Sequence, residues 1–289
     1  MKLIQYKYRE QNFDRVISFL KTMNRDDLSH INWNWARFQW MMGHPYTEYS
    51  LLDSIGLWFD GDKIVGAAIY DMYFGEAFIA TLPGYRHLLP EIADYAYENL
   101  KDENGLGIAV NDKDEELQAI LAEKGFSPVD QHETIMWIDI DKERECVLPE
   151  GLRMVNPDPV EDNGAMQWLF WQGFDHGTDY EEFRNTEQKP GREKKYLKKE
   201  LGIAAQNEKG ELVSFCCLWY MEGTDYAYVE PVCTIPSYRG KGIARSLIYE
   251  ALNRVKEMGA DKAYVISDNP FYEKLGFRKA ETYTFWWKK

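Results

Sequence analysis

Hydrophobic and polar positions change their period along the C-terminal part of the chain. Alternating apolar positions indicate strands, and apolar residues three or four apart indicate helices. The predicted elements are a strand at 152–155, a helix at about 159–172, an irregular and partly helical stretch to 200, three strands between 202 and 234, a helix at 242–258, a strand at 262–266, a helix at 270–275 and a strand at 282–287. This order predicts a mixed α/β fold.

The same order of features occurs twice along the chain. A Pro-x-Tyr-Arg sequence follows an apolar strand and ends at Arg86 and again at Arg239 (239 − 86 = 153). A glycine that precedes a phenylalanine follows a helical segment at Gly125 and again at Gly276 (276 − 125 = 151). A nearly constant separation between unrelated features predicts two copies of one fold.

A charged segment and a turn separate the two copies. Every residue from 141 to 145 is charged, and Pro149-Glu150-Gly151 is a typical turn sequence. We therefore predict two tandem domains, residues 1–147 and residues 148–289.

Composition and charge argue against several classes of protein. With 289 residues, 45% of them hydrophobic, the chain can build a core in each of two domains. Its net charge of −14 repels phosphate backbones, so we expect no nucleic-acid partner. The first nine residues lack the apolar core of a signal peptide, and no apolar run approaches the roughly 20 residues that cross a bilayer. We expect a cytoplasmic protein, a monomer or homodimer, without membrane contact.

The spacing of cysteine and histidine argues against a metal site. The four cysteines include an adjacent pair and form no C-x-x-C, and the five histidines form no H-x-x-x-H. We expect no metal and no disulfide framework.

The sharpest chemical signal is a strand that enters a Gly-rich turn and opens a helix, at residues 229–245. Consecutive backbone N–H groups at a helix N-terminus bind phosphate groups, and Arg239, Lys241 and Arg245 add positive charge. A P-loop is excluded because Ile243 follows Gly242. A dinucleotide fingerprint is disfavoured because Arg245 stands where it requires a third glycine. The turn therefore predicts an anion site of another kind.

Residues 239–244, Arg-Gly-Lys-Gly-Ile-Ala, resemble the coenzyme A motif Q/R-x-x-G-x-G/A of the GCN5-related N-acetyltransferase (GNAT) family. The Asn-x-x-Tyr and Gly-Phe sequences of that family are met at 269–272 and 276–277. The resemblance covers most of residues 151–289 in element order. It implies two tandem acyl-CoA N-acyltransferase (GNAT) domains with mixed sheets, a catalytic second copy and acetyl-CoA as the acyl donor.

The resemblance also implies which residues contact the coenzyme. In that family the pyrophosphate lies on the amides of this loop, and the preceding strand pairs with the pantetheine arm. The implied cofactor-binding residues are Val232, Cys233 and Thr234 on the strand, Arg239, Gly240, Lys241, Gly242, Ile243 and Ala244 in the loop, and Asn269. A backbone N–H near Cys233 would polarise the thioester carbonyl, and the thiol itself is expected to pack rather than to act as a nucleophile.

Two side chains are the predicted catalytic groups. Tyr272 stands where the family keeps a tyrosine near the coenzyme sulfur, so it is the candidate general acid, with an aromatic packing role as the alternative. Glu230 begins the cofactor strand and is the candidate general base, with a solvated strand-end acid as the alternative. Asn269 precedes a proline, so helix capping competes with cofactor contact. His176 lies in the region that lines acceptor pockets in this family, although a solvated loop histidine is the simpler interpretation.

The first copy departs from the motif. After Arg86 it reads His-Leu-Leu-Pro-Glu without a glycine, and Ala122 stands near the place of the tyrosine. We predict a degenerate domain that does not bind coenzyme A. Its aromatic segment 33–42 either packs in a core or helps to wall the acceptor pocket.

These patterns predict an acetyl-CoA-dependent N-acetyltransferase that acts directly on a small, cationic amine. One alternative is an acyl-CoA-binding sensor without catalysis. Another is an aminoacyl-tRNA-dependent transferase of related fold, against which the acidic balance argues.

Overall fold

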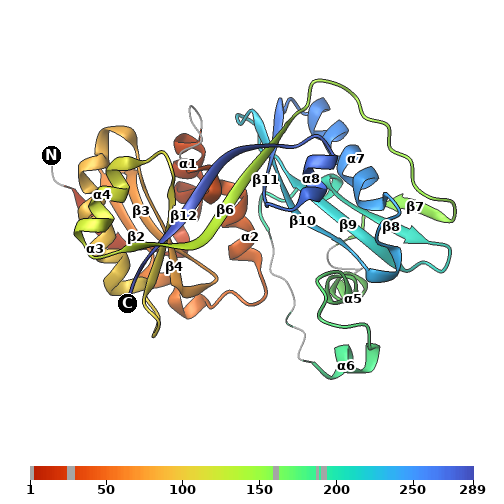
Figure 1. Ribbon diagram of the computed structural model, residues 1–289, viewed down its shortest axis with the longest axis horizontal. Helices are drawn as coiled ribbons and strands as arrows, with labels where there is room; N and C mark the ends of the chain where they lie inside the picture. The colour runs from red at the N-terminus through yellow and green to blue at the C-terminus, as the bar shows by residue number, and fades with distance from the viewer. Residues whose placement is uncertain (1–2, 25–29, 159–162, 187–188, 190–193) are drawn as a thin grey trace. The chain divides into compact units, whose positions relative to one another are not determined.

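The computed structural model describes residues 3–24, 30–158, 163–186, 189 and 194–289 (Figure 1). The chain divides into two units, each with its own core. The first unit comprises Met1–Met136, Ile266–Asp268 and Lys279–Lys289, and the second comprises Trp137–Val265 and Asn269–Arg278. Each unit is described below by itself.

The second unit is built on a sheet with the strand order β7-β8-β9-β10-β11. Neighbouring strands are antiparallel except β10 and β11, which are parallel. Strands β7 and β11 have the bounds that the sequence predicts. The strands are β7 (Leu152–Val155), β8 (Gly202–Asn207), β9 (Leu212–Trp219), β10 (Tyr226–Thr234) and β11 (Lys262–Ile266).

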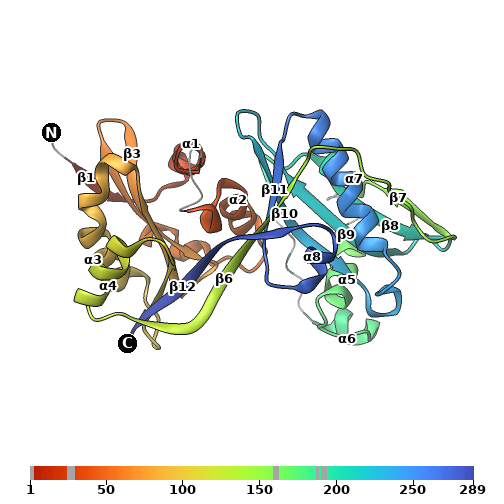
Figure 2. The same ribbon diagram turned by 45° about the horizontal axis from the view of Figure 1, so that its top comes forward.

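Helices cover both faces of this sheet, with α5 on one side and α7 on the other (Figure 2). Helix α7 forms because apolar residues recur on one face, where Leu247, Ala251 and Val255 are fully buried. The predicted helix at 159–172 is found as α5, although residues 159–162 lie outside the described part of the chain. The helices are α5 (Asn163–Gly173), α6 (Tyr180–Asn185), α7 (Ile243–Glu257) and α8 (Pro270–Lys274), with short 3-10 turns η5 (Lys199–Leu201) and η6 (Pro236–Tyr238).

The first unit contains the C-terminal strand of the chain. Its sheet follows the order β1-β2-β3-β4-β5-β12, and β12 pairs antiparallel with β5 from Tyr283 opposite Asn111 to Lys288 opposite Leu106. The two units are therefore not halves of the sequence, and the division near residue 148 stays a prediction about the two copies. The strands are β1 (Ile4–Lys7), β2 (Gly56–Asp60), β3 (Lys63–Asp71), β4 (Tyr73–Thr81), β5 (Leu106–Asn111) and β12 (Arg278–Lys288), and β6 (Ser127–Asp139) follows α4.

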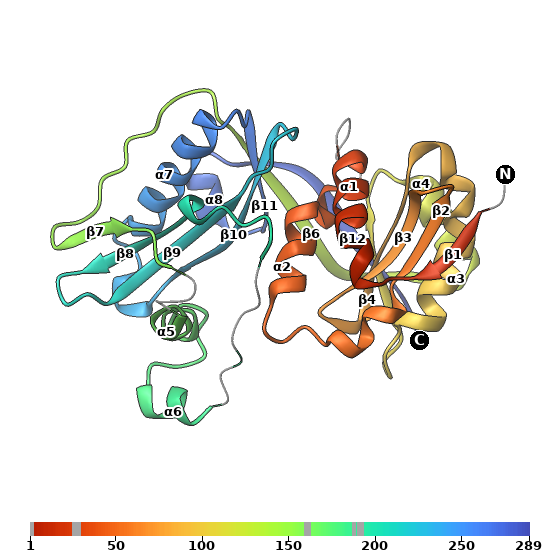
Figure 3. The same ribbon diagram turned by 180° about the vertical axis from the view of Figure 1, so that it is seen from behind.

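Most side chains of the aromatic segment 33–42 are buried in the first unit, and Figure 3 shows the helix α2 that carries most of them. Trp35 and Phe38 of α2 have no exposed surface, and Trp33 stacks on Phe78 with ring centroids 4.2 Å apart. Core packing is thus the interpretation that the burial supports. The helices are α1 (Phe13–Met23), α2 (Trp35–Gly43), α3 (Leu89–Leu100) and α4 (Glu115–Glu123), with 3-10 turns η1 (Glu10–Asn12), η2 (Ile31–Trp33), η3 (Tyr49–Ser54) and η4 (Pro83–Leu88).

The repeat is visible in the way that α4 and α8 end. Gly125 and Gly276 both have positive φ, 84° and 100°, and each follows the last turn of its helix. The next amide, that of a buried phenylalanine, donates to the carbonyl five residues back: to Leu121 in the first unit and to Tyr272 in the second, both at 3.0 Å. These are Schellman caps. They place Leu121 at the position of Tyr272, one residue before Ala122.

The helices of the described residues fall short of a membrane span, since none of them is both long enough and apolar enough to cross a bilayer.

Candidate functional site

Strands β10 and β11 separate after three paired positions. Tyr226 to Tyr228 pair with Lys262 to Tyr264, whereas β10 continues beside β9 as far as Thr234. A register shift lies between Val229 and Val232, where the Glu230–Pro231 peptide is cis. The described part of β10 beyond Tyr228 thus has one edge without a strand partner.

Two amides on this edge point to the open side. Ile235 donates its N–H to Val213 at the start of β9, at 3.0 Å. Because successive amides alternate in direction along a strand, the N–H groups of Val232 and Thr234 point away from β9. These are the amides that flank Cys233, where the sequence predicts a donor to a carbonyl oxygen.

The glycine turn leaves the start of α7 open. Gly240 and Gly242 have φ of 74° and 79°, the left-handed conformation that favours glycine. Gly242 is the N-cap, no side chain caps the helix, and no acid stands in its first turn. The first amides of this 15-residue helix are therefore available to an anion. Arg245 reaches back over the turn, because a Cβ added at Gly242 would lie 3.5 Å from its Nη2 atom.

Arg239 makes hydrogen bonds and an ion pair within the protein that the sequence did not predict. Its Nε donates to the Thr234 carbonyl at 2.9 Å, and its Nη2 donates to the Gly173 carbonyl at 3.0 Å. The same Nη2 pairs with Asp175 at 2.9 Å. Arg239 therefore ties the end of β10 to the end of α5 and shapes the turn, rather than offering free charge to it. The cation of Lys241 lies over the Tyr238 ring, 4.7 Å from its centroid.

Cys233 is a packing residue in this geometry. It is 5% exposed, and burial raises the pKa of its thiol to about 12. A Cβ added at Gly173 would lie 2.8 Å from its sulfur, so α5 approaches β10 closely here. Ile243 is 1% exposed and packs in the core, while Val232, Thr234 and Ala244 are half-buried.

Glu230 is held by its neighbours on the sheet. The hydroxyl of Tyr228 donates to its Oε2 at 2.5 Å, and the indole N–H of Trp219 donates to its backbone carbonyl at 2.7 Å. Tyr228 and Trp219 are directly opposite each other on β10 and β9. Neither contact to Glu230 is predicted from the sequence, although the spacing of Tyr228 and Glu230 puts them on one face of a strand.

Tyr272 lies within electrostatic reach of Glu230. Burial, together with the nearby Cys216 and Glu230, raises the pKa of the Tyr272 phenol above its usual value. Its ring packs edge-on against Phe277 with centroids 5.4 Å apart. The predicted acid and the predicted base are thus brought together. Asn269 caps α8, since its side chain accepts the Phe271 N–H at 2.9 Å, so its contact with a cofactor stays a prediction.

Lys194 and His176 are two further residues of the second unit whose surroundings bear on the candidate site. Burial lowers the pKa of Lys194, which interacts with Cys217 of β9, and Cys217 in turn interacts with Glu230. No periodicity marks Lys194, because it lies in an irregular segment. His176 is exposed and lies against the Trp171 ring with centroids 5.4 Å apart, which agrees with a solvated loop residue.

A groove of about 610 Å³ is lined by residues of α7. One wall consists of Arg245 and Tyr249 of α7, and another consists of Leu275 and Gly276 after α8. The third wall is the segment 138–147, which we call the strap. Arg245 thus faces both the glycine turn and this groove.

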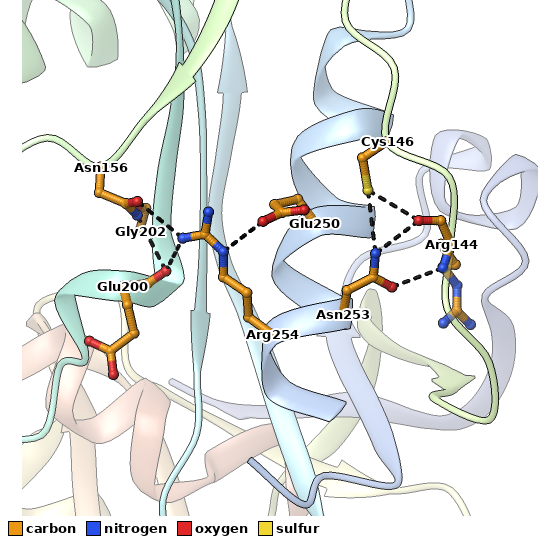
Figure 4. A network of polar contacts seen from close by, with 8 residues as sticks. All are labelled: Arg144, Cys146, Asn156, Glu200, Gly202, Glu250, Asn253 and Arg254. Carbon is orange, nitrogen blue, oxygen red and sulfur yellow. Dashed lines mark hydrogen bonds and ion pairs between the residues drawn. The ribbon is translucent and has the colours of Figure 1, made fainter. Parts of the chain in front are cut away.

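Side chains of α7 anchor the strap (Figure 4). Asn253 accepts the Arg144 N–H at 2.9 Å and donates to the Arg144 carbonyl at 2.8 Å. Ser246 donates to the Val147 carbonyl at 2.5 Å. On the other side of the helix, Arg254 pairs with Glu250 at 2.8 Å and donates to the Glu200 carbonyl at 2.6 Å. The groove therefore has a fixed wall.

The corresponding loop of the first copy is closed by side chains. Arg86 pairs with Asp114 at 2.6 Å and also with Glu116. Glu91 stands in the first turn of α3 and accepts the indole N–H of Trp58 at 2.9 Å. An acid at this helix start opposes anion binding, because the helix dipole there already has its negative partner.

A search of the described residues for clusters of His, Cys, Asp and Glu that could hold a metal ion finds none.

Comparisons with known proteins agree with this geometry. Residues 164–277 match the model of the Acetyltransferase (GNAT) family. The uncharacterized N-acetyltransferase YhbS of Escherichia coli (strain K12) is 30% identical over 84 residues, which are 28% of this chain and 50% of YhbS. The mycothiol acetyltransferase of Corynebacterium aurimucosum is 39% identical over 77 residues, 24% of this chain and 25% of that protein. The chain thus spans half or less of these two curated relatives.

A solved structure covers both copies. A tandem GNAT protein from the clavulanic acid biosynthesis pathway matches with a TM-score of 0.63 and 16% identity, over 99% of this chain and 98% of that one. At this identity the likeness shows the fold, and it confirms the predicted tandem arrangement of two mixed α/β domains.

Proposed function

This chain belongs to the acetyltransferase (GNAT) family through its second copy, and we propose on that basis that the second copy transfers an acetyl group from acetyl-CoA to an amine. The observation that carries the proposal is the open edge of β10 beside the uncapped start of α7. Free amides at a helix start suit a pyrophosphate, and an unpaired strand edge suits an extended pantetheine arm. The first copy is proposed to bind no coenzyme, because its loop lacks both glycines.

The turn fits the coenzyme by backbone shape and charge. Gly240 and Gly242 hold a conformation in which amides face outward, and Arg245 brings a cation over them. Arg239 contributes by fixing the turn. The full set of proposed cofactor contacts is Val232, Cys233, Thr234, Arg239, Gly240, Lys241, Gly242, Ile243, Ala244 and Asn269.

The groove along α7 is the proposed seat of the nucleotide end. Lys142 and Arg245 line it, and neither has an ion-pair partner among the residues described. Asp139 in the same wall is already paired with Arg278 at 2.6 Å. The lining also includes the acids Asp141, Glu143 and Glu145, so its charges balance. Arg245, which reaches the glycine turn as well, is the cation that favours a phosphorylated nucleoside.

Acetyl-CoA supplies the acetyl group and the thiol that leaves. Glu230 accepts the proton of the attacking amine, through water, as the carbon–nitrogen bond forms. The amide of Val232 or Thr234 donates to the carbonyl oxygen while negative charge develops there. Tyr272 gives its proton to the sulfur as the carbon–sulfur bond breaks, and solvent then returns a proton from Glu230 to Tyr272. A raised pKa keeps the Tyr272 phenol protonated at neutral pH, which this role requires.

The proposed acceptor is a small, cationic amine. The chain carries a net charge of −14, which attracts cations. On α5 and α6, Trp168 packs against Tyr180 with centroids 5.2 Å apart, and Tyr180 is 51% exposed. Asp179 and Glu181 adjoin Tyr180 in sequence, and the Asp179 carboxylate caps α6. Aromatic faces beside carboxylates suit an alkylammonium group.

Calorimetric titration with acetyl-CoA tests the proposal. We expect one site per chain, and we expect Gly242→Glu to weaken binding by about 100-fold or more, because it strains a residue at φ 79° and brings a carboxylate to the anion site. Gly84→Glu is the matched control, since it alters the loop of the first copy where an added Cβ meets no atom within 4 Å.

Absence of binding by the wild type would overturn the proposal. Two sites per chain would overturn the assignment of a single coenzyme site. Once binding is established, release of free thiol in the presence of polyamines, aminoglycosides or amino-acid derivatives identifies the acceptor. A non-catalytic acyl-CoA sensor is the second candidate, and it predicts binding without thiol release.

A further inference from the structure

We propose that Tyr228 is a positioning residue, which fixes the orientation of the Glu230 carboxylate and favours its charged form, while Trp219 fixes the backbone beneath it. This inference rests on the proposed role of Glu230 as the general base. It goes beyond that role because it identifies the two side chains that prepare the base.

The first support is the geometry at the irregular part of β10. Glu230 lies within the register shift between Val229 and Val232, and an irregularity of this kind re-aims the side chains of a strand. Two residues before Glu230, Tyr228 stands opposite Trp219, and this pair supplies two donors. One reaches the side chain of Glu230 at 2.5 Å and the other reaches its carbonyl at 2.7 Å. Both the carboxylate and the peptide that carries it are therefore held.

The second support is the rigidity of the two donors. Tyr228 is 2% exposed and Trp219 is 1% exposed, so neither ring has room to adopt another rotamer. Glu230 itself is only half-buried, which leaves its carboxylate open to solvent or to an acceptor. A buried donor that holds a half-buried carboxylate fixes its orientation without covering it.

Groups from several elements act on Glu230. Tyr228 of β10 donates to it, Cys217 of β9 interacts with it, and so does Tyr272 of α8. Lys194 interacts with Cys217 from the segment before η5. The Tyr228 hydroxyl donates directly to the carboxylate, and a donor to the charged form lowers the pH at which a carboxylate titrates.

The test compares Tyr228→Phe with Tyr226→Phe. Tyr226 lies two residues earlier on the same strand and is also 2% exposed, but its hydroxyl has no hydrogen-bond partner among the described residues. Each variant removes a single buried hydroxyl. With carboxyl-¹³C-labelled glutamate, the Glu230 signal is identified by its absence in Glu230→Gln and is followed by NMR through a pH titration.

We expect the titration midpoint of Glu230 to rise by about one pH unit in Tyr228→Phe and to stay unchanged in Tyr226→Phe. The acidic limb of the pH–rate profile for acetyl transfer should move to higher pH by the same amount, and the KM for acetyl-CoA should stay unchanged. An unmoved midpoint in a folded Tyr228→Phe chain would overturn the inference.

Two further readings separate the possible failures. The titration needs no turnover, so a wild type that binds no acetyl-CoA would refute the proposed function and still report on Tyr228. If Tyr228→Phe does not fold, the comparison of the wild type with Glu230→Gln decides: the Tyr228 hydroxyl proton should resonate downfield in the wild type and move upfield in Glu230→Gln. A hydroxyl signal that is the same in both proteins would contradict the contact.

Discussion

The two copies of the fold agree at a helix cap and differ at the loop that opens a helix. Both α4 and α8 end in a Schellman cap with a glycine at positive φ, and the bond lengths match at 3.0 Å. At the start of α7, Gly240 and Gly242 leave the amides open. At the start of α3 the glycines are missing, and Glu91 and Arg86 are committed to other side chains. The scaffold therefore tolerates the loss of the site.

The motif arginines show the same divergence. Arg239 joins β10 to α5 through two carbonyl oxygens and a carboxylate, whereas Arg86 pairs with two carboxylates at the start of α4. The shared Pro-x-Tyr-Arg sequence therefore preserves a local turn, and we expect the residues that follow to decide whether the turn binds an anion.

The largest effect is expected at Tyr272, whose equivalent position in the first copy is occupied by Leu121. Tyr272→Phe should lower kcat by about 10²–10⁴ if the hydroxyl is the general acid, with unchanged affinity for acetyl-CoA. Burial raises the pKa of Tyr272, so the protonated form extends to higher pH. We therefore expect wild-type kcat to show no alkaline decline below about pH 10. Thiol release across the pH range measures both effects.

Tyr97→Phe is the control for this substitution. Tyr97 packs against Phe126 of the first copy, with centroids 6.0 Å apart, much as Tyr272 packs against Phe277. Its removal should leave kcat within about twofold, since a surface change away from the site has little effect. A small effect of Tyr272→Phe, in a chain that still turns over, would reassign the acid.

Much of this arrangement is predictable from the sequence, because local signals define it. Periodicity and glycine positions predict the strands at 152–155 and 262–266 and the turn at 239–244. The motif identifies Tyr272 as a candidate, and its role stays a prediction. The sequence did not predict that β12 belongs to the first unit, because strand pairing across 170 residues leaves no local trace (282 − 112 = 170, the Asp112 amide bonding to the Thr282 carbonyl). The contacts of Arg239 with Gly173 and Asp175 were not predicted either, because these residues are also distant in the sequence.

An intermediate effect is expected from the two motif arginines. Arg239→Ala should weaken acetyl-CoA binding about tenfold, because the turn loses its ties to Thr234 and Gly173. Arg86→Ala should leave that affinity unchanged and lower the free energy of unfolding by about 0.5–1 kcal/mol, since half-exposed ion pairs contribute little. Calorimetry and urea unfolding of both variants provide the measurements. Equal losses of affinity would remove the functional distinction between the copies.

The smallest effect is expected where the copies are alike. An alanine Cβ at Gly125 or at Gly276 would make no contact closer than 3.5 Å. Each substitution to Ala should therefore lower the free energy of unfolding by about 1 kcal/mol, through the strain of a positive φ alone. Gly164→Ala in α5 is the control: its φ is ordinary, nothing lies within 4 Å, and it should stabilise by about 0.5–1 kcal/mol. Urea unfolding measures all three. Equal losses of unfolding free energy at Gly125 and Gly276 would mean that both copies require the same helix cap, and that the proposed difference in coenzyme binding lies in the loop alone. A much larger loss at Gly276 would mean that the cap of α8 also shapes the site around Tyr272.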